Sequence, residues 1–264
     1  MTAKDEYTEI QSCMKEMGIS FSAAEIATWA AAEGASDEDL RHIRSPLDAI
    51  AEKRRNERMS FLMKISRIPE ACVKTFDNYD FARLFGSSKD SLLQLRSLGF
   101  IHTGQTIAFF GETGTGKTHL ASAIGLECCK RGFSAYFITM KDLADKMAKA
   151  ISDGRTAKFL NGFSSQKCLI IDKMDHCCLD IRQTMLFFQL VDKRYKKRSG
   201  NIVITSNRQP SEWGELFADK QTGECILDRL FDHLISVSFS GSSFRGSDRL
   251  LLSFKAKSPS VILK

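Results

Sequence analysis

Residues 111–118 read Gly-Glu-Thr-Gly-Thr-Gly-Lys-Thr, the spacing G-x-x-x-x-G-K-[ST] of a loop that wraps phosphate groups. Its glycines let backbone N–H groups curl around phosphate oxygens, and Lys117 supplies a cation to the β- and γ-phosphates. The Thr118 hydroxyl is suited to ligating Mg²⁺. The loop therefore predicts a site for ATP and Mg²⁺, lined by Gly111, Glu112, Thr113, Gly114, Thr115, Gly116, Lys117, Thr118 and His119.

A second candidate residue ends the apolar segment Lys-Cys-Leu-Ile-Ile-Asp, residues 167–172. A carboxylate at the end of a buried strand can hold Mg²⁺ through water, so Asp172 is predicted to be a metal ligand together with Thr118. Lys117 and Asp172 are then the first two candidate catalytic residues. The alternative is that Asp172 does no more than end a strand.

The elements that must position these residues follow from the hydrophobic pattern after residue 105. Short apolar runs alternate with longer amphipathic segments, among them residues 118–132, 141–151 and 184–197. This alternation predicts an α/β fold with a five-stranded parallel sheet that is flanked by helices on both faces. The predicted strands are residues 106–110, 134–139, 167–171, 201–206 and 234–239.

The segment before the sheet has helical signals instead, and residues 1–67 are predicted to form a small all-α N-terminal domain. Ser22 and Glu25 have the spacing of a capping box, and Gly34 supplies a stop. A second helix is expected to begin near Ser36 and to resume past Pro46. Residues 68–105 are interpreted as a connector with a short helix at about 88–98, residues 106–245 as the ATP-binding domain, and residues 246–264 as a tail without an assigned role.

Composition narrows the class of protein. The 264 residues are 43% hydrophobic and 27% charged, with a net charge of +6, which is typical of a globular chain. Because no apolar run approaches the roughly 18 residues of a membrane span and the N-terminus lacks a signal-peptide pattern, we expect a cytoplasmic protein without membrane contact. Its eight cysteines contain no C-x-x-C, which favours buried thiols over disulfides or zinc.

Two basic clusters are candidates for contacts with nucleic acid. The first, within residues 53–67, carries enough cations to neutralise several phosphates of duplex DNA, with little base readout. Its predicted DNA-binding residues are Lys53, Arg54, Arg55, Arg58, Lys64 and Arg67. The second, residues 193–198, ends a helix whose predicted buried stripe is Thr184, Phe188, Val191 and Tyr195, so its cations are also explained as partners of the helix dipole.

The chain resembles the IstB-type ATP-binding proteins of insertion sequences, which are related to DnaC-type helicase loaders. The resemblance covers most of residues 40–245 and implies a P-loop AAA+ core. In that family the ATP-bound protein forms a homo-oligomer on double-stranded target DNA and recruits a transposase, and its N-terminal helices contribute to those contacts. The matching segments are GETGTGKTHLASAIG, GFSAYFITMKDL, LIID, FFQLVDKRY, ITSNRQPSEWGELFAD, ILDRLFDH and GSSFR.

The resemblance also implies three further catalytic residues. Asn207 is similar to the polar sensor near the γ-phosphate, Arg229 to the finger arginine of a neighbouring subunit, and Arg245 to the second sensor. An arginine suits such roles because its planar fork stabilises charge on a transferring phosphoryl group. For both arginines a surface salt bridge remains the alternative.

One departure from the family affects hydrolysis. The family has Glu after the acidic strand, whereas this chain has Lys173, and a charged lysine cannot accept the proton of the attacking water. Asp175 is the nearest substitute. We therefore predict that ATP binds but turns over slowly or not at all. Two alternatives to the transposition helper stay open, a helicase loader that binds a replicative helicase and a nonhydrolysing nucleotide-bound scaffold on DNA.

Overall fold

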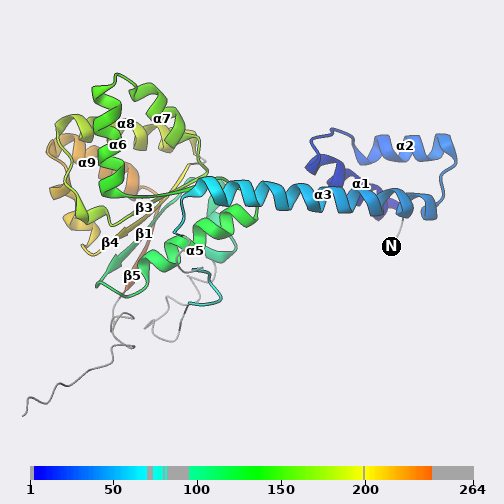
Figure 1. Cartoon of the computed structure of the whole chain (residues 1–264), viewed down its shortest axis with the longest axis horizontal. Coiled ribbons are helices and arrows are strands. Elements are labelled where there is room, and N and C mark those ends of the chain that lie inside the picture. Colours follow the sequence, from blue (N-terminus) through cyan, green and yellow to red (C-terminus); the bar gives the residue numbers. More distant parts are fainter. Residues whose placement is uncertain (1–2, 70–73, 80, 82–94, 199, 240–264) are drawn as a thin grey trace, which may run out of the picture.

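The computed structural model describes residues 3–69, 74–79, 81, 95–198 and 200–239. It has a small helical unit and a larger α/β domain, joined by the long helix α3 (Asp37–Ser66) (Figure 1). The helices α1 (Ala3–Glu16) and α2 (Ala23–Glu33) lie beside the first half of α3 and form the helical unit with it. The other end of α3 packs on the α/β domain. No helix in the described part of the chain is long and apolar enough to cross a bilayer.

The helical unit is stabilised by the caps that the sequence predicted. The Ser22 hydroxyl accepts the backbone N–H of Glu25, whose carboxylate bonds back to Ser22, and Gly34 ends α2 in the left-handed conformation. Ser36 and Asp39 form the same reciprocal cap at the start of α3. The buried residues between the three helices are Ile10, Ile26, Ala30 and Leu40.

Helix α3 continues without a break through Pro46, so the predicted interruption there is wrong. A proline inside a helix removes one backbone donor and would normally kink or end the helix. Here the turn on either side is attached to α1: Arg44 Nη1 bonds Glu6 Oε2 at 2.9 Å, and Cys13 Sγ donates to Asp48 Oδ1 at 2.8 Å. These tertiary contacts keep the turn helical.

The α/β domain contains one five-stranded sheet, and the strands were predicted correctly. They are β1 (Thr106–Gly111), β2 (Ala135–Thr139), β3 (Cys168–Asp172), β4 (Asn201–Ser206) and β5 (Leu234–Phe239). Their order is β2-β3-β4-β1-β5, and every neighbouring pair is parallel. Strand β4 therefore lies between β1, which leads into the phosphate loop, and β3, which ends at Asp172.

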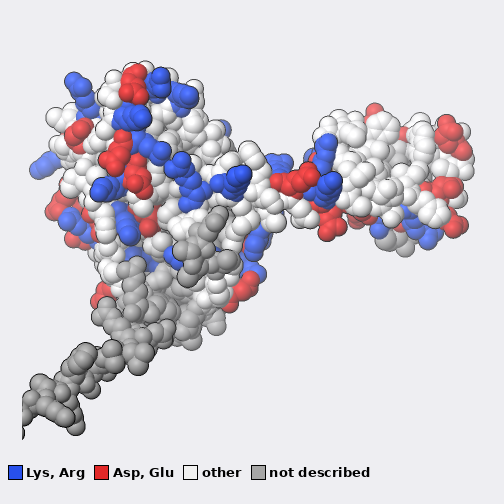
Figure 2. Space-filling view, viewed as in Figure 1, with Lys and Arg blue, Asp and Glu red and all other residues white. Residues whose placement is uncertain are grey.

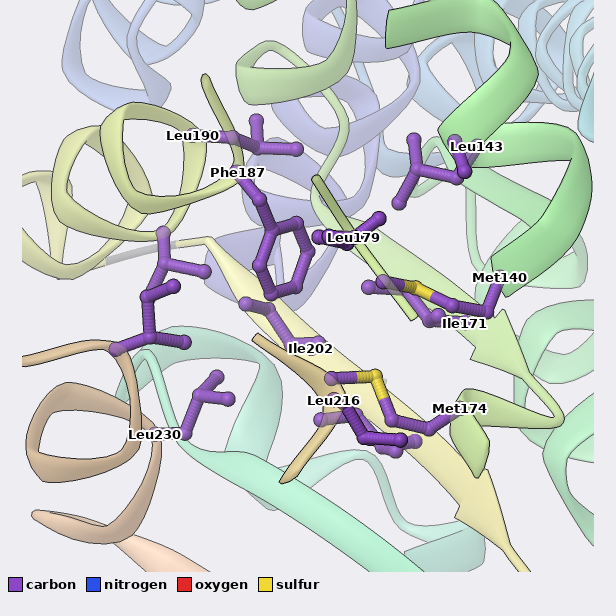
Figure 3. Close-up of a cluster of buried hydrophobic side chains, with 14 of the residues drawn as sticks. Met140, Leu143, Ile171, Met174, Leu179, Phe187, Leu190, Ile202, Leu216 and Leu230 are labelled. Atoms are coloured by element: carbon purple, nitrogen blue, oxygen red, sulfur yellow. The ribbon is translucent and has the colours of Figure 1, made fainter. Parts of the chain in front are cut away.

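Helices cover both faces of this sheet, which gives a three-layer arrangement (Figure 1). One face packs against α6 (Met140–Ser152), α7 (Thr156–Ser164), α8 (Ile181–Lys197) and α9 (Lys220–Phe231), and Figure 3 shows part of this core. The other face packs against α5 (Lys117–Lys130) and the end of α3. Strand β1 alternates accordingly, because Ala108 and Phe110 face the first core while Ile107 and Phe109 face the second.

The connector is part of the second core rather than a separate linker. Its described residues include the 3₁₀ helix η2 (Gly99–His102) and six buried side chains. These are Phe76, Tyr79, Leu95, Leu98, Phe100 and Ile101. Most of the predicted helix at 88–98 and the whole tail 246–264 lie outside the described residues.

The buried face of α8 differs by one position from the predicted stripe. Thr184 and Val191 are buried and Phe188 is partly buried, but Tyr195 is 42% exposed. The preceding residue, Arg194, is buried in its place with only 1% of its surface exposed. The prediction therefore failed at the last turn of α8, where a cation rather than an aromatic ring enters the core.

Arg194 is held by backbone carbonyl groups from two segments. Its guanidinium donates to the oxygens of Phe163 at 2.7 Å, Gln166 at 3.0 Å and Asn201 at 2.6 Å. Burial lowers the pKa of Arg194 to about 10, so the group stays charged at neutral pH. The side chain joins α8 to the end of α7 and to the start of β4, and it is not a solvent-exposed partner of the helix dipole.

Candidate nucleotide site

The phosphate loop lies between β1 and α5, and its shape depends on glycine at two positions. Gly111 has a φ of 128°, and a Cβ there would lie 2.0 Å from the carbonyl oxygen of Phe239. Gly116 has a φ of 93°, and a Cβ there would lie 2.5 Å from the ring of Tyr79. A side chain at either position would collide with a neighbour and strain the backbone. The glycine spacing is thus explained by the packing of this loop against β5 and the connector.

Inside the loop, Lys117 is 6% exposed and donates to two carbonyl oxygens. Its Nζ lies 2.7 Å from Gly111 O and 2.6 Å from Glu112 O. The Thr115 hydroxyl also donates to Glu112 O, at 2.7 Å. These bonds hold the ammonium group at the centre of the loop, where phosphate oxygens, which are stronger acceptors, can take over from the carbonyl groups.

Thr118 and Asp172, the two expected metal ligands, are hydrogen-bonded to each other. Thr118 Oγ1 donates to Asp172 Oδ1 at 2.8 Å, and Thr205 Oγ1 donates to the same oxygen at 2.6 Å. Asp172 is 3% exposed, and the two hydroxyls offset the cost of burying its carboxylate. Hydroxyl and carboxylate oxygens are the hard ligands that Mg²⁺ prefers. The side chains of Thr118 and Asp172 therefore fit a magnesium ion at this edge of the sheet.

The sensor candidate Asn207 follows β4 at the same edge and is held by Asp175. Its backbone N–H donates to Asp175 Oδ1 at 3.0 Å, and its side-chain amide donates to Oδ2 at 3.1 Å. Burial by itself would raise the pKa of Asp175, but the hydrogen bonds from Asn207 outweigh it and keep that pKa below its usual value. Both oxygens of Asp175 are thus engaged in orienting Asn207.

Lys173 follows Asp172 in the left-handed conformation, with a φ of 56°. Its backbone N–H donates to Thr205 Oγ1 at 2.9 Å, while its side chain is exposed. Thr205 therefore connects the end of β3 to β4 by donating to Asp172 and accepting from Lys173. The position that follows the acidic strand holds a cation, and the next carboxylate, Asp175, is bound to Asn207.

The connector contributes residues to the loop that sequence reasoning did not assign. The Tyr79 hydroxyl donates to Thr115 O at 3.2 Å, and the ring packs on Gly116. His119 Nε2 lies 2.9 Å from Thr75 O and 3.0 Å from Asn78 Oδ1. Burial lowers the pKa of His119, which favours its neutral form. The only signal for these contacts was the run of aromatic and amide residues in TFDNYDF, residues 75–81.

Comparison with known proteins identifies the family. A family model described as "IstB-like ATP binding protein" matches residues 15–251. The chain belongs to that family. The protein named for ATP binding in insertion sequence IS5376 of Geobacillus stearothermophilus is 36% identical over 196 residues, which are 74% of this chain and 76% of the relative. Its counterpart from IS21 of Pseudomonas aeruginosa is 32% identical over 187 residues, 71% of this chain and 69% of the relative.

Solved structures show the same fold at lower identity. The crystal structure of the DnaC helicase loader superposes with a TM-score of 0.53 at 23% identity, covering 63% of this chain and 97% of that chain. DnaI superposes with a TM-score of 0.55 at 16% identity, covering 67% of this chain and 94% of that chain. The α/β domain of this IstB-like protein thus has the same fold as the DnaC helicase loader and DnaI, and the predicted relation to DnaC-type proteins is confirmed at the level of the fold.

Two arginines complete the set of predicted catalytic residues, and the structure describes one of them. Arg229 lies on α9, where its Nε bonds Asp192 Oδ1 at 3.0 Å and its guanidinium stacks 4.8 Å from the centre of the Phe188 ring. Its Nη1 donates to Cys225 O at 2.9 Å. Arg245 lies outside the described residues. In the single chain Arg229 is therefore attached to α8.

The basic residues of α3 divide into two groups. Arg54 donates to Met17 O at 2.5 Å, Arg55 Nη1 lies 2.7 Å from Glu16 Oε1, and Arg58 donates to Gly132 O at 3.0 Å. These three bonds attach α3 to the end of α1 and to the turn before β2. The other predicted contacts are Lys53, Lys64 and Arg67, of which Arg67 lies over the Tyr136 ring at 5.9 Å from its centre. All six side chains are exposed.

The segment SEWGELFAD, residues 211–219, supports the end of β4. Trp213 is completely buried, and its Nε1–H donates to Ser206 Oγ at 3.2 Å at the end of β4. Asn207 directly follows Ser206 in the chain. The Trp213 anchor therefore fixes the point at which the backbone turns toward Asp175.

Proposed function

We propose that this IstB-like protein binds ATP with Mg²⁺ and, in that state, assembles as a homo-oligomer on duplex DNA, where it recruits a transposase. The observation that carries this proposal is the 2.8 Å contact between Thr118 Oγ1 and Asp172 Oδ1. It joins the phosphate loop to the acidic strand and offers two oxygen ligands to one metal ion. Bound Mg²⁺ would neutralise charge on the phosphates, while Lys117 and the loop N–H groups hold them in place.

The geometry also supports slow hydrolysis. A general base must lie within hydrogen-bond reach of the attacking water and be able to accept its proton. Lys173 is a cation with an exposed side chain, and Asp175 already accepts two bonds from Asn207. Bound ATP would then persist and maintain the assembled state, and it would not be hydrolysed in rapid cycles.

The assembly test is sedimentation velocity of the full chain with and without ATP, Mg²⁺ and a 50-base-pair duplex. We expect larger species only when nucleotide is present, and the DNA to move with them. Lys117→Met removes the cation that donates to Gly111 O and Glu112 O, and it should abolish this response without unfolding the protein. Sedimentation that is identical with and without ATP contradicts the proposal.

The hydrolysis test compares Lys173→Glu with Lys173→Gln. We expect the glutamate variant to raise steady-state turnover by about 10²-fold, the lower end of what a positioned base contributes. The glutamine variant removes the cation without supplying a base and should leave turnover low. Rapid turnover in the unmodified protein, or equal rates in both variants, contradicts the assignment.

Partner choice separates the transposition helper from a helicase loader of the DnaC type, whose fold this chain shares. A tagged form of this chain with bound ATP should capture a transposase and not a replicative helicase. Arg229 is proposed to act on the nucleotide of a neighbouring copy, which requires its bond to Asp192 to open in the oligomer. Arg229→Lys should then slow turnover in the oligomer and leave ATP affinity unchanged.

A further inference from the structure

A basic cleft of about 560 Å³ lies between α3 and the edge of the sheet opposite the nucleotide site. It is lined by α3, by the end of α5 together with the turn before β2, and by Lys167, which directly precedes β3. One carboxylate, that of Glu16, lines it. Its six cations, which we call the neck cations, are Arg54, Arg55, Arg58, Lys130, Arg131 and Lys167. Figure 2 shows Lys and Arg side chains both on the stalk formed by α3 and on the neighbouring part of the α/β domain.

The charges of these side chains are fixed in place but only partly neutralised. Arg58 donates to Gly132 O, and Arg131 donates to the carbonyl oxygens of Ser97 and Arg96, so these bonds orient the guanidinium groups without cancelling their charge. Carbonyl acceptors satisfy donors and leave the cation uncompensated.

Acidic side chains neutralise only part of the charge of the remaining neck cations. Lys130 and Arg131 share the single carboxylate of Glu127, at 3.7 and 3.3 Å, and Arg55 is paired with Glu16. Lys167 has no acidic partner among the residues that the structure describes. Like charges gathered in a concave, low-dielectric surface focus a positive potential there. An anionic ligand would remove this repulsion.

The spacing of the cations on α3 suits an extended anion. Arg54 and Arg58 are four residues apart on α3 and so about 6 Å apart along its axis. One strand of a DNA duplex carries a phosphate about every 3.4 Å of axis, so these two cations can contact neighbouring phosphates of one strand. The Ser134 side chain also lines the cleft and supplies a hydroxyl of the kind that contacts phosphate.

The lining favours duplex over single-stranded nucleic acid. Single strands are held by aromatic rings on which bases stack. Among the described residues that line this cleft, Phe133 alone is aromatic, and its ring already packs edge-on against His102 with centroids 5.6 Å apart. We propose that the neck cations bind the sugar-phosphate backbone of duplex DNA. This assignment rests on the proposed function, and it adds Lys130, Arg131 and Lys167 of the AAA+ core to the DNA-binding surface.

The test is fluorescence anisotropy of a labelled 30-base-pair duplex with the full chain, ATP and Mg²⁺, over a series of salt concentrations. Lys167→Glu should weaken affinity about tenfold or more and reduce the salt slope by about one. The matched control is Lys220→Glu, which makes the same charge change at the exposed start of α9, on the other face of the sheet. It should bind within about twofold of the unmodified protein. Both variants should bind a fluorescent ATP analogue normally, which shows that the core is folded.

Equal losses in the two variants, or no loss in either, overturn the cleft assignment while leaving the proposed function standing. Tighter binding of a single strand of the same sequence also overturns it, as does competition by inorganic phosphate at millimolar concentration with full displacement of the duplex. If the unmodified protein with ATP binds no duplex at all, the DNA part of the proposed function fails together with the cleft.

Discussion

Replacing Thr205 with valine removes one hydroxyl from the candidate magnesium site and keeps the branched shape of the side chain. That hydroxyl donates to Asp172 Oδ1 at 2.6 Å and accepts the N–H of Lys173 at 2.9 Å. A hydrogen bond to a charged group contributes about 1.5–3 kcal/mol, and losing a residue that orients a metal ligand lowers metal affinity about 10- to 100-fold. We expect Mg²⁺-dependent ATP affinity to fall by a factor in that range.

The assay is a Mg²⁺ titration at a fixed concentration of a fluorescent ATP analogue, with thermal unfolding of the nucleotide-free protein as a check on folding. Thr205→Ser keeps the hydroxyl and is the matched control, because it can make both hydrogen bonds and should bind within about threefold of the unmodified protein. An unchanged Mg²⁺ midpoint in the valine variant would show that Asp172 does not depend on Thr205 for its orientation.

Three further predictions concern Arg194, His119 and Gly116. Arg194→Leu leaves three carbonyl groups, one in a buried and two in part-buried hydrogen bonds, without this donor, and it should lower the free energy of unfolding by about 3–5 kcal/mol in urea titrations. The exposed neighbour Lys193→Met should change it little. His119 has a pKa lowered by burial, so the unfolded chain binds more protons and stability should fall as pH drops below about 6.5. His119→Gln should flatten that dependence in thermal unfolding between pH 7 and pH 5. Gly116→Ala should weaken ATP binding at least about tenfold because of its positive φ and crowded Cβ, while Gly162→Ala, which has open space, should not.

The sheet and the phosphate loop could be predicted because their signals are local. Each strand is an uninterrupted apolar run, and the glycine spacing of the loop directly precedes α5. Lys117 and Asp172 could be expected at one edge because the carboxyl ends of parallel strands lie together. The capping boxes of α2 and α3 are equally local, since each joins residues three apart.

The remainder depended on contacts between segments that are far apart in the sequence. Thr205 reaches Asp172 only because β3 and β4 pair with Ile171 beside Ile204, a register that hydrophobic runs do not specify. The burial of Arg194 depends on carbonyl groups of another helix and another strand. An arginine in a basic run gives no sign of such partners, so the sequence could not distinguish it from its solvated neighbours.

Because α3 is continuous, a small tilt at its base produces a larger displacement at its far end. Its 30 residues give a rod about 45 Å long, so a tilt of roughly 5° at its base moves the far end by about 4 Å. That base packs on α5, the helix that begins at Lys117, and Ile68 just beyond it approaches Gly125 of the same helix. A displacement too small to disturb packing in the core thus becomes a shift of about 4 Å at α1 and α2.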